Sequence, residues 1–492
     1  MSQTGSKRVA IVGGGITGLA CAHRFVELNR ESTQRFHVTL FEAGTRWGGV
    51  VGTHQIDNYL VEQGADNFLT DKPWGVDLCR RIGLGERIIA TEEKHRGSLV
   101  IRNGKPVSVP EGFVLMAPSK IWPIVKTPIF SPWGKLRMAC EYFVRRRTET
   151  GDESVAHFIR RRFGGEVLDR LVQPLVGGIY TADPEKLSLA ATLPRFVTME
   201  REHGSLIRAM RRQACAKAAA SRPEDAGARY GLFVSFPHGM SELIDRLVER
   251  ITPHATLRLN APIASLADSE KPSGCYALAL NDGTTTEFDA VVLTTPAYRA
   301  AELVKSIDSQ LADDLAAIDY ASSVVVVSGH RLQNVCHPLD AFGLVVPACE
   351  HRQVLAISFS SRKFPDRAPQ GEVLLRTFVG GALQPELVNL NDAEIELLVR
   401  RELGDLLGVT GQPTFLRVVR YPRGMPQYHV GHKSRIAAIF ERLTAHPGLA
   451  LAGNAYEGVG IPDCIHSGEQ AADKIAKSEC RNPNVESMTK SE

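Results

Sequence analysis

The sequence predicts an α/β fold in which one parallel-sheet domain is assembled from separated pieces of the chain. Three observations support this prediction. A strand, a glycine turn and a helix follow one another near the N-terminus, a buried strand recurs at 290–293, and a strand, a glycine loop and a helix return at 449–478. With 492 residues, 43% of them hydrophobic and 23% charged, the chain has enough apolar sequence for two or three packed domains.

The first pattern begins at Arg8 with the sequence RVAIVGGGITGLACAHRF. Its apolar run at 9–12 reads as a buried strand, and glycines follow at G-x-G-x-x-G spacing before a helical pattern starts. A second strand, at 37–41, ends in Glu42. Such glycines let the backbone turn tightly and approach a pyrophosphate at a helix N-terminus, and the acid accepts hydrogen bonds from a ribose. The pattern therefore predicts a Rossmann-like domain that binds a dinucleotide.

Two further segments interrupt this domain. The first is 91–228, within which residues 112–212 are rich in Arg, Trp, Phe and Met and mostly helical by pattern, with an amphipathic helix expected over 132–147. That helix either packs on its own domain or rests on a membrane interface. Residues 298–440 combine β-like runs with a helix and predict a mixed α+β domain. The full division is 1–90, 229–297 and 441–478 for the nucleotide-binding domain, 91–228 and 298–440 for the insertions, and 479–492 for a disordered tail.

Charge and cysteine usage narrow the class of protein. A net charge of +3 gives no global field for nucleic acid, and the arginine runs at 145–147, 160–162 and 211–212 are local. They form solvated helix faces, or they meet a membrane surface or an acidic substrate. Nine cysteines without a C-x-x-C pair indicate free thiols and no metal site. The sequence contains no run of about 18 uninterrupted apolar residues, so no membrane-spanning helix is predicted.

The second glycine loop selects the dinucleotide. Glu42 favours a free ribose 2′-hydroxyl and disfavours NADP. A dehydrogenase that uses NAD alone has no need of a second loop, at 453–460, which suits the longer FAD. The helix after Pro462-Asp463 would point its positive N-terminus toward the flavin. Without a second G-x-G-x-x-G motif for a nicotinamide cofactor, the chain is predicted to be an oxidase whose FAD is reoxidised by oxygen or a quinone. No acid–base pair stands out as catalytic.

Taken together, the motifs resemble those of the oxygen-dependent protoporphyrinogen oxidase family, relatives of flavin amine oxidases and carotene desaturases. The resemblance covers nearly the whole chain. Its most specific parts are GADN at 64–67, PLVGGIYTADPEKLS at 174–188, FPHGMSEL at 236–243, MPQYHVGH at 425–432 and LAGNAYEGVGIPDCI at 451–465.

The resemblance implies an FAD domain, a helical membrane-associating domain and a mixed substrate domain. It implies a six-electron oxidation of a porphyrinogen to the porphyrin in haem biosynthesis, with electrons passing through FAD to oxygen and hydrogen peroxide as product. Homologues act on protoporphyrinogen IX or on coproporphyrinogen III. The apolar character of 112–147 favours protoporphyrinogen IX, the more hydrophobic of the two. A flavin amine oxidase, a carotenoid desaturase and a non-enzymatic FAD scaffold are the other readings.

Site residues follow from the resemblance position by position. Asn67, Arg96 and Gly178 are the expected substrate contacts, although Asn67 stands where many relatives have an arginine. Ile263 lies in the adenine-side strand, and Tyr421 lies at a usually aromatic flavin-side position. The expected FAD contacts are Gly13, Gly14, Gly15, Ile16, Thr17, Gly18, Glu42, Ala43, Gly49, Val50, Gly64, Ala65, Asp66, Asn67, Ile263, Tyr421, Val459, Gly460 and Ile461.

Partners and location complete the expectations. The resemblance implies a porphyrinogen and molecular oxygen as reactants, and it is compatible with hand-over of product to a ferrochelatase and with a homodimer. No nucleic acid is expected to bind. We expect a cytoplasmic location, peripheral on the inner face of the cell membrane.

Overall fold

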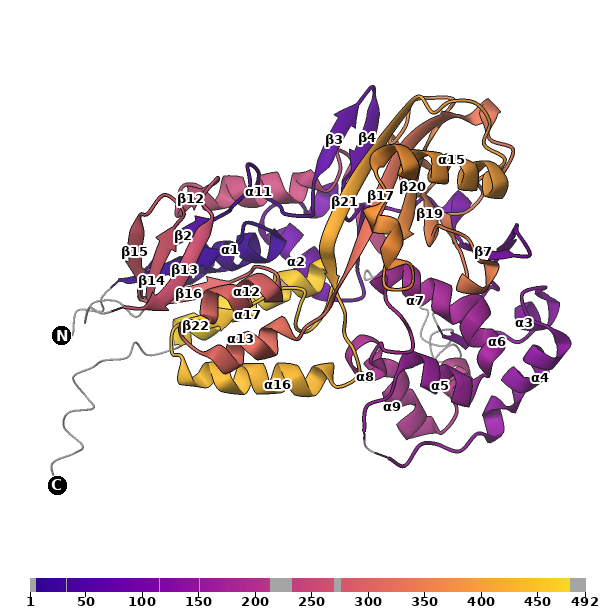
Figure 1. Cartoon of the computed structure of the whole chain (residues 1–492), viewed down its shortest axis with the longest axis horizontal. Coiled ribbons are helices and arrows are strands. Elements are labelled where there is room, and N and C mark those ends of the chain that lie inside the picture. Colours follow the sequence, from indigo (N-terminus) through magenta and orange to yellow (C-terminus); the bar gives the residue numbers. More distant parts are fainter. Residues whose placement is uncertain are drawn as a thin grey trace.

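The computed structural model describes residues 6–31, 33–114, 116–149, 151–212, 232–269 and 276–477. Three bodies make up this part of the chain: a parallel-sheet domain, a domain built on a larger mixed sheet, and a cluster of helices beside both (Figure 1). The tail predicted at 479–492 lies outside the described residues. Within the described ranges, no helix is long and apolar enough to cross a bilayer.

The first domain is built on a five-stranded parallel sheet with the order β12-β2-β1-β16-β22. Val9 pairs with Val38 on one side and with Ala290 on the other. Because the inner strands are covered on both faces, they read in the sequence as continuous apolar runs. The sheet joins separated parts of the chain, as predicted: β1 (Lys7–Val12), β2 (Phe36–Phe41), β12 (Thr256–Arg258), β16 (Ala290–Leu293) and β22 (Leu449–Leu451).

Helices cover both faces of this sheet (Figure 1). Helix α1 (Ile16–Glu31) packs against α17 (Ile461–Lys477), and a Cβ on Gly468 of α17 would lie only 2.3 Å from the Thr17 carbonyl oxygen. That close approach brings the C-terminal helix against the N-terminal one. The remaining helices and the second small sheet of this domain are α2 (Pro73–Arg81), α11 (Ser241–Ile251), α12 (Ala297–Val304), α13 (Ser309–Ala316), α16 (His432–Arg442), β13 (Ile263–Asp268), β14 (Tyr276–Leu280) and β15 (Thr285–Phe288).

The second domain contains a seven-stranded sheet with the order β21-β17-β20-β19-β18-β7-β8. Helix α15 (Asp392–Leu407) packs on one face of it. Its strands are β17 (Tyr320–Arg331), β18 (Gly343–Val345), β19 (Ala356–Phe359), β20 (Glu372–Gly380), β21 (Phe415–Pro426), β7 (Leu99–Arg102) and β8 (Lys105–Ser108).

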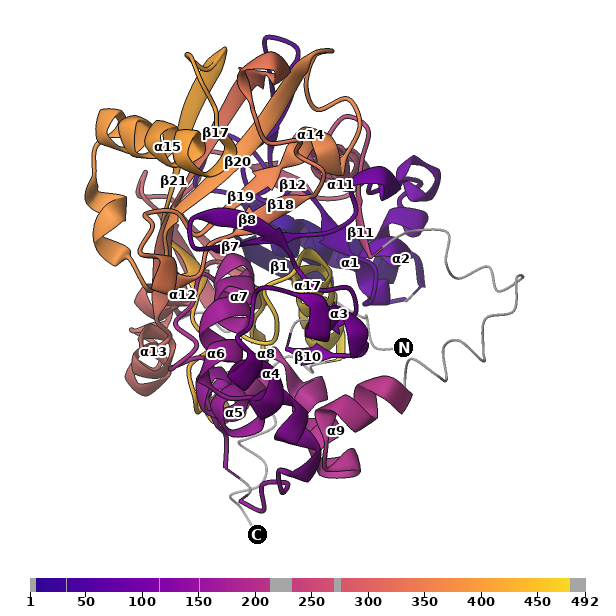
Figure 2. The same ribbon diagram turned by 90° about the vertical axis from the view of Figure 1, so that its right-hand side faces the viewer.

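Strands β7 and β8 come from the segment that we assigned to the helical insertion, yet they form one edge of this sheet. The reason lies in the alternation of β7. Leu99 and Ile101 enter the core beneath α15, whereas Val100 enters the core of the helical cluster. The hairpin therefore belongs to both bodies, and it lies over α7 between the sheet and the helices (Figure 2). The other domain boundaries stay predictions.

The helical cluster corrects two expectations. The helix predicted over 132–147 ends at Phe143, because the following chain is extended and the Arg147 backbone N–H donates to Glu200 Oε1 at 3.2 Å. The run at 160–162 is not simply a solvated face, since Arg162 is fully buried. The cluster comprises α3 (Trp122–Lys126), α4 (Pro132–Ala139), η3 (Cys140–Phe143), α5 (Val155–Arg162), α6 (Gly165–Val167), η4 (Leu168–Val172), α7 (Gln173–Tyr180), α8 (Leu189–Thr192) and α9 (Pro194–His203).

Shorter elements connect the three bodies. Strands β7 and β8 pair as a hairpin around the turn residues Asn103 and Gly104. The other short strands and helices are β3 (Thr53–Ile56), β4 (Tyr59–Glu62), β5 (Phe68–Leu69), β6 (Ile89–Ala90), β9 (Phe113–Val114), β10 (Ala117–Pro118), β11 (Phe233–Ser235), α14 (Ser360–Lys363), and 3-10 turns at Gly85–Arg87, Glu93–His95, Leu332–Asn334, Ala348–Glu350, Pro385–Asn389 and Leu443–Ala445.

Candidate cofactor and substrate site

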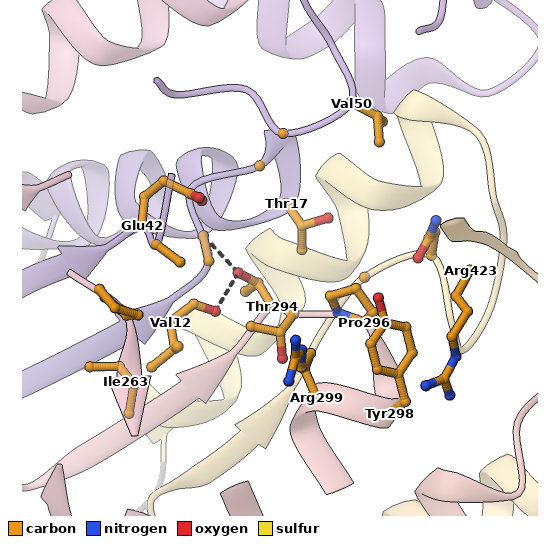
Figure 3. A pocket seen from close by; sticks show the side chains of 18 of the residues that line it. Val12, Thr17, Glu42, Val50, Ile263, Thr294, Pro296, Tyr298, Arg299 and Arg423 are labelled. Carbon is orange, nitrogen blue, oxygen red and sulfur yellow. Dashed lines mark hydrogen bonds between the residues drawn. The ribbon is translucent and has the colours of Figure 1, made fainter. Parts of the chain in front are cut away.

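A cavity of about 740 Å³ opens where β1, β2 and β16 end (Figure 3). Ligands of α/β sheets bind at this carboxyl edge, because the loops that follow the strands leave a crevice there. Many of the expected FAD contacts line it together: Gly13, Gly15, Ile16, Thr17, Glu42, Ala43, Gly49, Val50, Ile263 and Tyr421. The structure thus brings residues from both domains to one space, although their contacts with FAD stay predictions.

The glycines of the N-terminal turn are required for different structural reasons. A Cβ added to Gly15 would meet no atom within 4 Å, so this position faces open space. A Cβ on Gly18 would lie 1.9 Å from the Gly13 carbonyl oxygen, so that glycine is required by packing of the turn itself. Gly13 has a φ of +113°, and its carbonyl oxygen accepts a hydrogen bond from Thr294 Oγ1 at 2.8 Å (Figure 3). The open cradle at Gly15, before the N-terminus of α1, fits the pyrophosphate of FAD.

Glu42 is fixed by the glycine turn rather than free in the cavity. Its carboxylate accepts backbone hydrogen bonds from Gly14 and from Gly44, both at 2.7 Å. Gly14 does not line the cavity and instead faces the Trp47 ring. A Cβ added to Gly14 would lie only 2.5 Å from an atom of that ring. Two charge-assisted hydrogen bonds orient the carboxylate, and its remaining lone pairs fit the hydroxyls of a ribose.

Two loops close over the turn. The Gly48 N–H donates to the Gly14 carbonyl oxygen at 2.8 Å, and a Cβ on Gly49 would lie 3.4 Å from the Gly15 Cα. A Cβ on Gly64 would lie 2.0 Å from the Val50 carbonyl oxygen, so only glycine permits this approach. The glycine turn at 13–15 therefore contacts the loop at 48–50, and that loop in turn contacts Gly64.

The C-terminal glycine loop reaches the same cavity through Gly453 and Asn454. Its shape depends on Tyr428, whose buried hydroxyl donates to the Asn454 carbonyl oxygen at 2.5 Å and accepts from the Gly458 N–H at 2.9 Å. Burial also raises the pKa of Tyr428 well above its ordinary value, so the hydroxyl keeps its proton for that donation. The expected contacts Val459, Gly460 and Ile461 follow this loop; Ile461 begins α17, and none of the three lines the cavity.

Sequence analysis missed Tyr428, although the signal was present: it is an aromatic residue with a polar end inside the MPQYHVGH motif. The residues after β16 were also missed as cavity residues, namely Thr294, Thr295, Pro296 and Tyr298. The Arg423 guanidinium from β21 stacks on the Tyr298 ring at 3.8 Å (Figure 3). Because this pair joins two domains, no local pattern could have predicted it.

The expected contacts Gly64, Ala65, Asp66 and Asn67 do not line the cavity, but Gly64 packs against the backbone of Val50, which does. Asp66 pairs with Lys363 at 3.2 Å and with Arg376 at 3.5 Å, and the Asn67 side-chain amide donates to its carboxylate. Burial alone would raise the pKa of Asp66, but the two cations outweigh it and hold the pKa below the ordinary value. The group is therefore a buried carboxylate ion.

The three expected substrate contacts do not form one cluster. Arg96 is exposed on the chain that leads into β7, and Gly178 is exposed on α7. A Cβ on Gly178 would lie 3.5 Å from Val345 Cγ1, so this glycine faces strand β18 of the larger sheet. Among the described residues, no hydrogen bond or ion pair links Asn67, Arg96 and Gly178, and their roles stay predictions. The same ranges hold no group of three metal-ligating side chains.

Comparison with known proteins places the chain among flavoproteins. Residues 16–476 match the family described as flavin containing amine oxidoreductase. The coproporphyrinogen III oxidase of Bacillus subtilis (strain 168) is 34% identical over 473 residues, which cover 95% of this chain and 97% of that protein. The mitochondrial protoporphyrinogen oxidase of Nicotiana tabacum is 30% identical, with 96% and 95% covered. A solved structure from Exiguobacterium sp. 255-15, assigned as a protoporphyrinogen oxidase, is 31% identical, covers 96% of this chain and 99% of its own, and superposes with a TM-score of 0.83.

Proposed function

The chain belongs to the flavin containing amine oxidoreductase family, and we propose that within this family it oxidises a porphyrinogen to the porphyrin. The observation that carries the proposal is the full-length similarity to porphyrinogen oxidases, at 27–34% identity over nearly the whole chain. The family also confirms the predicted flavin, and the open cradle at Gly15 fits FAD.

Coproporphyrinogen III is the substrate that we propose first, with protoporphyrinogen IX second. The apolar stretch 112–147 favoured protoporphyrinogen IX from sequence alone. The relatives named coproporphyrinogen III oxidase, however, are 33–34% identical to the chain, whereas the plant relatives named protoporphyrinogen oxidase are 27–30% identical. Both reactions remove the same six hydrogens from the macrocycle, so the chemistry of the site is unchanged by this choice.

The residues of the chain would act mainly by binding and shaping. When bound, FAD supplies the two-electron oxidation chemistry and passes electrons to oxygen. Gly15 leaves space for the pyrophosphate, Glu42 receives the ribose, and Tyr428 holds the C-terminal glycine loop. The N-terminus of α17 lies directly after that loop, and its partial positive charge favours negative charge in the cavity.

The test supplies each porphyrinogen to the purified protein in air and follows porphyrin fluorescence together with peroxide. We expect rapid oxidation of coproporphyrinogen III, with three peroxides formed for each porphyrin because six electrons leave in pairs. The control is a reaction without protein, which measures autoxidation. Equal rates with and without protein for both substrates would refute the function, whereas a large preference for protoporphyrinogen IX would refute only the choice of substrate.

We also propose that the helical cluster rests on an anionic membrane surface. Large apolar side chains stand exposed on α3, on the residue before it, on α4 and on η3: Ile121, Trp122, Val125, Trp133, Leu136 and Phe143. The four largest exposed fractions are 87% for Phe143, 79% for Trp133, 74% for Trp122 and 55% for Leu136. Trp133 and Leu136 are three residues apart on α4, so they share one face of that helix, and Phe143 follows in η3. Exposed Lys120, Lys126, Arg145 and Arg146 flank this surface. Such a combination favours insertion of aromatic side chains beneath anionic headgroups.

Several partner expectations stay predictions within the same proposal. Oxygen would be the electron acceptor, and a ferrochelatase would receive a porphyrin product. A homodimer and a cytoplasmic, peripheral location complete this picture. The membrane surface defined above is the part of it that substitutions can test directly.

A further inference from the structure

The loop at 63–67, between β4 and β5, is held by two basic side chains of the larger sheet domain. Arg376 lies on β20 and Lys363 ends α14. Arg376 is 312 residues from Gly64 in the sequence, and Lys363 is 297 residues from Asp66. Neither side chain lines the cofactor cavity, so neither can contact a ligand there directly.

Arg376 holds the backbone of this loop. Its guanidinium donates to the Gly64 carbonyl oxygen and, at 3.4 Å, to the Gln63 carbonyl oxygen. The side chain is only 3% exposed, and its cation lies 5.5 Å from the centre of the Phe378 ring. One nitrogen, Nη2, donates to both carbonyl oxygens, while Nη1 lies 3.5 Å from an Asp66 carboxylate oxygen. The rigid planar guanidinium therefore reaches the backbone and the carboxylate at the same time, whereas a lysine has a single nitrogen for both.

Lys363 and Arg376 together place two positive charges around one carboxylate. Lys363 Nζ lies 3.3 Å and 3.2 Å from the two Asp66 carboxylate oxygens, and Arg376 lies 3.5 Å from one of them. All three side chains are at most 13% exposed. Two further buried charged residues, Glu62 and Arg367, lie near the same carboxylate and carry one charge of each sign. Lys363 and Arg376 against the single carboxylate of Asp66 leave one positive charge in excess.

Backbone contacts connect this cluster with the cavity. Gly64, which Arg376 grips, packs on the Val50 carbonyl group, and Val50 lines the cavity. Gly49 precedes it and packs on Gly15 at the pyrophosphate cradle. A displacement of Gly64 is therefore passed to the cavity wall, because glycines at these contacts leave no side chain to absorb it.

We propose that Arg376 and Lys363 are positioning residues for the flavin: Arg376 fixes the wall formed by Gly64 and Val50, and the two cations leave an excess positive charge behind that wall. A flavin gains negative charge when it is reduced, and a buried cation nearby favours that gain. The inference rests on the flavin assignment but not on the identity of the porphyrinogen.

The test measures the reduction potential and the FAD dissociation constant of variants of the full-length holoprotein. In Lys363→Met, which removes charge but no backbone contact, we expect the equilibrium constant for reduction to fall about tenfold, or about 30 mV for a two-electron couple. In Arg376→Met we expect the same shift together with FAD binding weakened about tenfold or more, because the Gly64 carbonyl loses a buried donor. Arg376→Lys keeps the charge, so its potential should stay near that of the parent while FAD still binds more weakly.

The matched control is Arg417→Met. Arg417 lies directly opposite Val327 on the neighbouring strand, as Arg376 does on the other side, but it is exposed. We expect no change in either quantity. An unchanged potential in Lys363→Met would overturn the electrostatic role, and unchanged FAD affinity in both Arg376 variants would overturn the positioning role. If Arg376→Met does not fold, Arg376→Lys and Lys363→Met still decide each point. Neither measurement uses a porphyrinogen, so a wrong substrate would not affect the result.

Discussion

The carboxylate of Glu42 accepts a 2.7 Å hydrogen bond from the backbone N–H of Gly14, twenty-eight positions earlier in the chain. This contact joins the end of β2 to the glycine turn that follows β1. It fixes the acid beside the cavity before any ligand binds, so no entropy is lost in orienting the carboxylate when a ribose arrives. The cofactor site is therefore shaped largely by contacts within the protein itself.

Gly15 and Gly18 should respond differently to the same substitution. In Gly15→Val the new side chain enters open space in the cavity, so we expect a folded protein that is purified with little or no FAD. In Gly18→Val the Cβ collides with the Gly13 carbonyl oxygen, so we expect loss of folded protein as well. Flavin absorbance and thermal unfolding distinguish the two outcomes. A full flavin complement in Gly15→Val would contradict the placement of the pyrophosphate.

Tyr428→Phe tests the support of the C-terminal glycine loop. The substitution keeps the ring but removes both hydrogen bonds of the hydroxyl, and the Asn454 carbonyl and the Gly458 N–H lose their partner. We expect a loss of about 1–3 kcal/mol in the free energy of unfolding and weaker FAD binding. Tyr142→Phe is a suitable comparison, because that hydroxyl accepts an exposed hydrogen bond from Arg211. Equal behaviour of the two variants would argue against a special role for Tyr428.

The buried ion pair of the helical cluster should dominate its stability. Arg162 and Glu141 are both fully buried and paired, and Glu141 also accepts from Ser205 Oγ at 2.6 Å and Leu206 N at 2.8 Å. Arg162→Met would leave a buried carboxylate without its cation, at a cost of about 3–5 kcal/mol in urea unfolding. Arg160→Met breaks only an exposed pair with Glu185, and it should cost about 0–1 kcal/mol. Similar costs for both variants would refute this distinction.

His432 should make the protein less stable in mild acid. Its ring is 2% exposed and stacked on Tyr428 at 4.1 Å, and burial lowers its pKa to about 4. Between pH 6.5, the ordinary histidine value, and pH 4, the unfolded chain takes up a proton that the folded chain does not, so stability falls as the pH is lowered through this window. In His432→Gln the free energy of unfolding should fall less steeply with decreasing pH, by a slope that corresponds to up to one proton. Unfolding experiments at several pH values measure this slope. Parallel curves for variant and parent would contradict the prediction.

The membrane surface can be tested by introducing charge. Trp133→Glu with Leu136→Glu places two anions on the exposed face of α4, and we expect binding to vesicles of phosphatidylcholine and phosphatidylglycerol to fall at least about tenfold. Leu397→Glu is the control, because Leu397 is 72% exposed on α15, away from this face. Sedimentation with vesicles measures the partition. Retained binding in the double variant, or no binding by the parent, would refute the proposal.

Local pattern was sufficient for the backbone of the cofactor site. The apolar run before Gly13, the glycine spacing and Glu42 specify a strand, a turn and an acid within about 35 residues, and the structure has them in that order. The hairpin around Asn103-Gly104 also depends on local sequence, because these two residues adopt the positive φ that its tight turn requires. The apolar periodicity over 132–147 overestimates the length of the helix, because the contact of the Arg147 backbone N–H with Glu200 depends on tertiary structure.

The sequence by itself determined the class of cofactor, the parallel sheet assembled from separated pieces, and the family, because each depends on short motifs whose spacing the backbone geometry dictates. Tertiary structure alone decided what holds those motifs in place. Tyr428 meets Gly458, Arg376 meets Gly64, and Arg162 lies buried within a run that looks solvated. The physical reason is that a buried polar group must find its partner wherever folding brings one, and that partner can be hundreds of residues away in the chain.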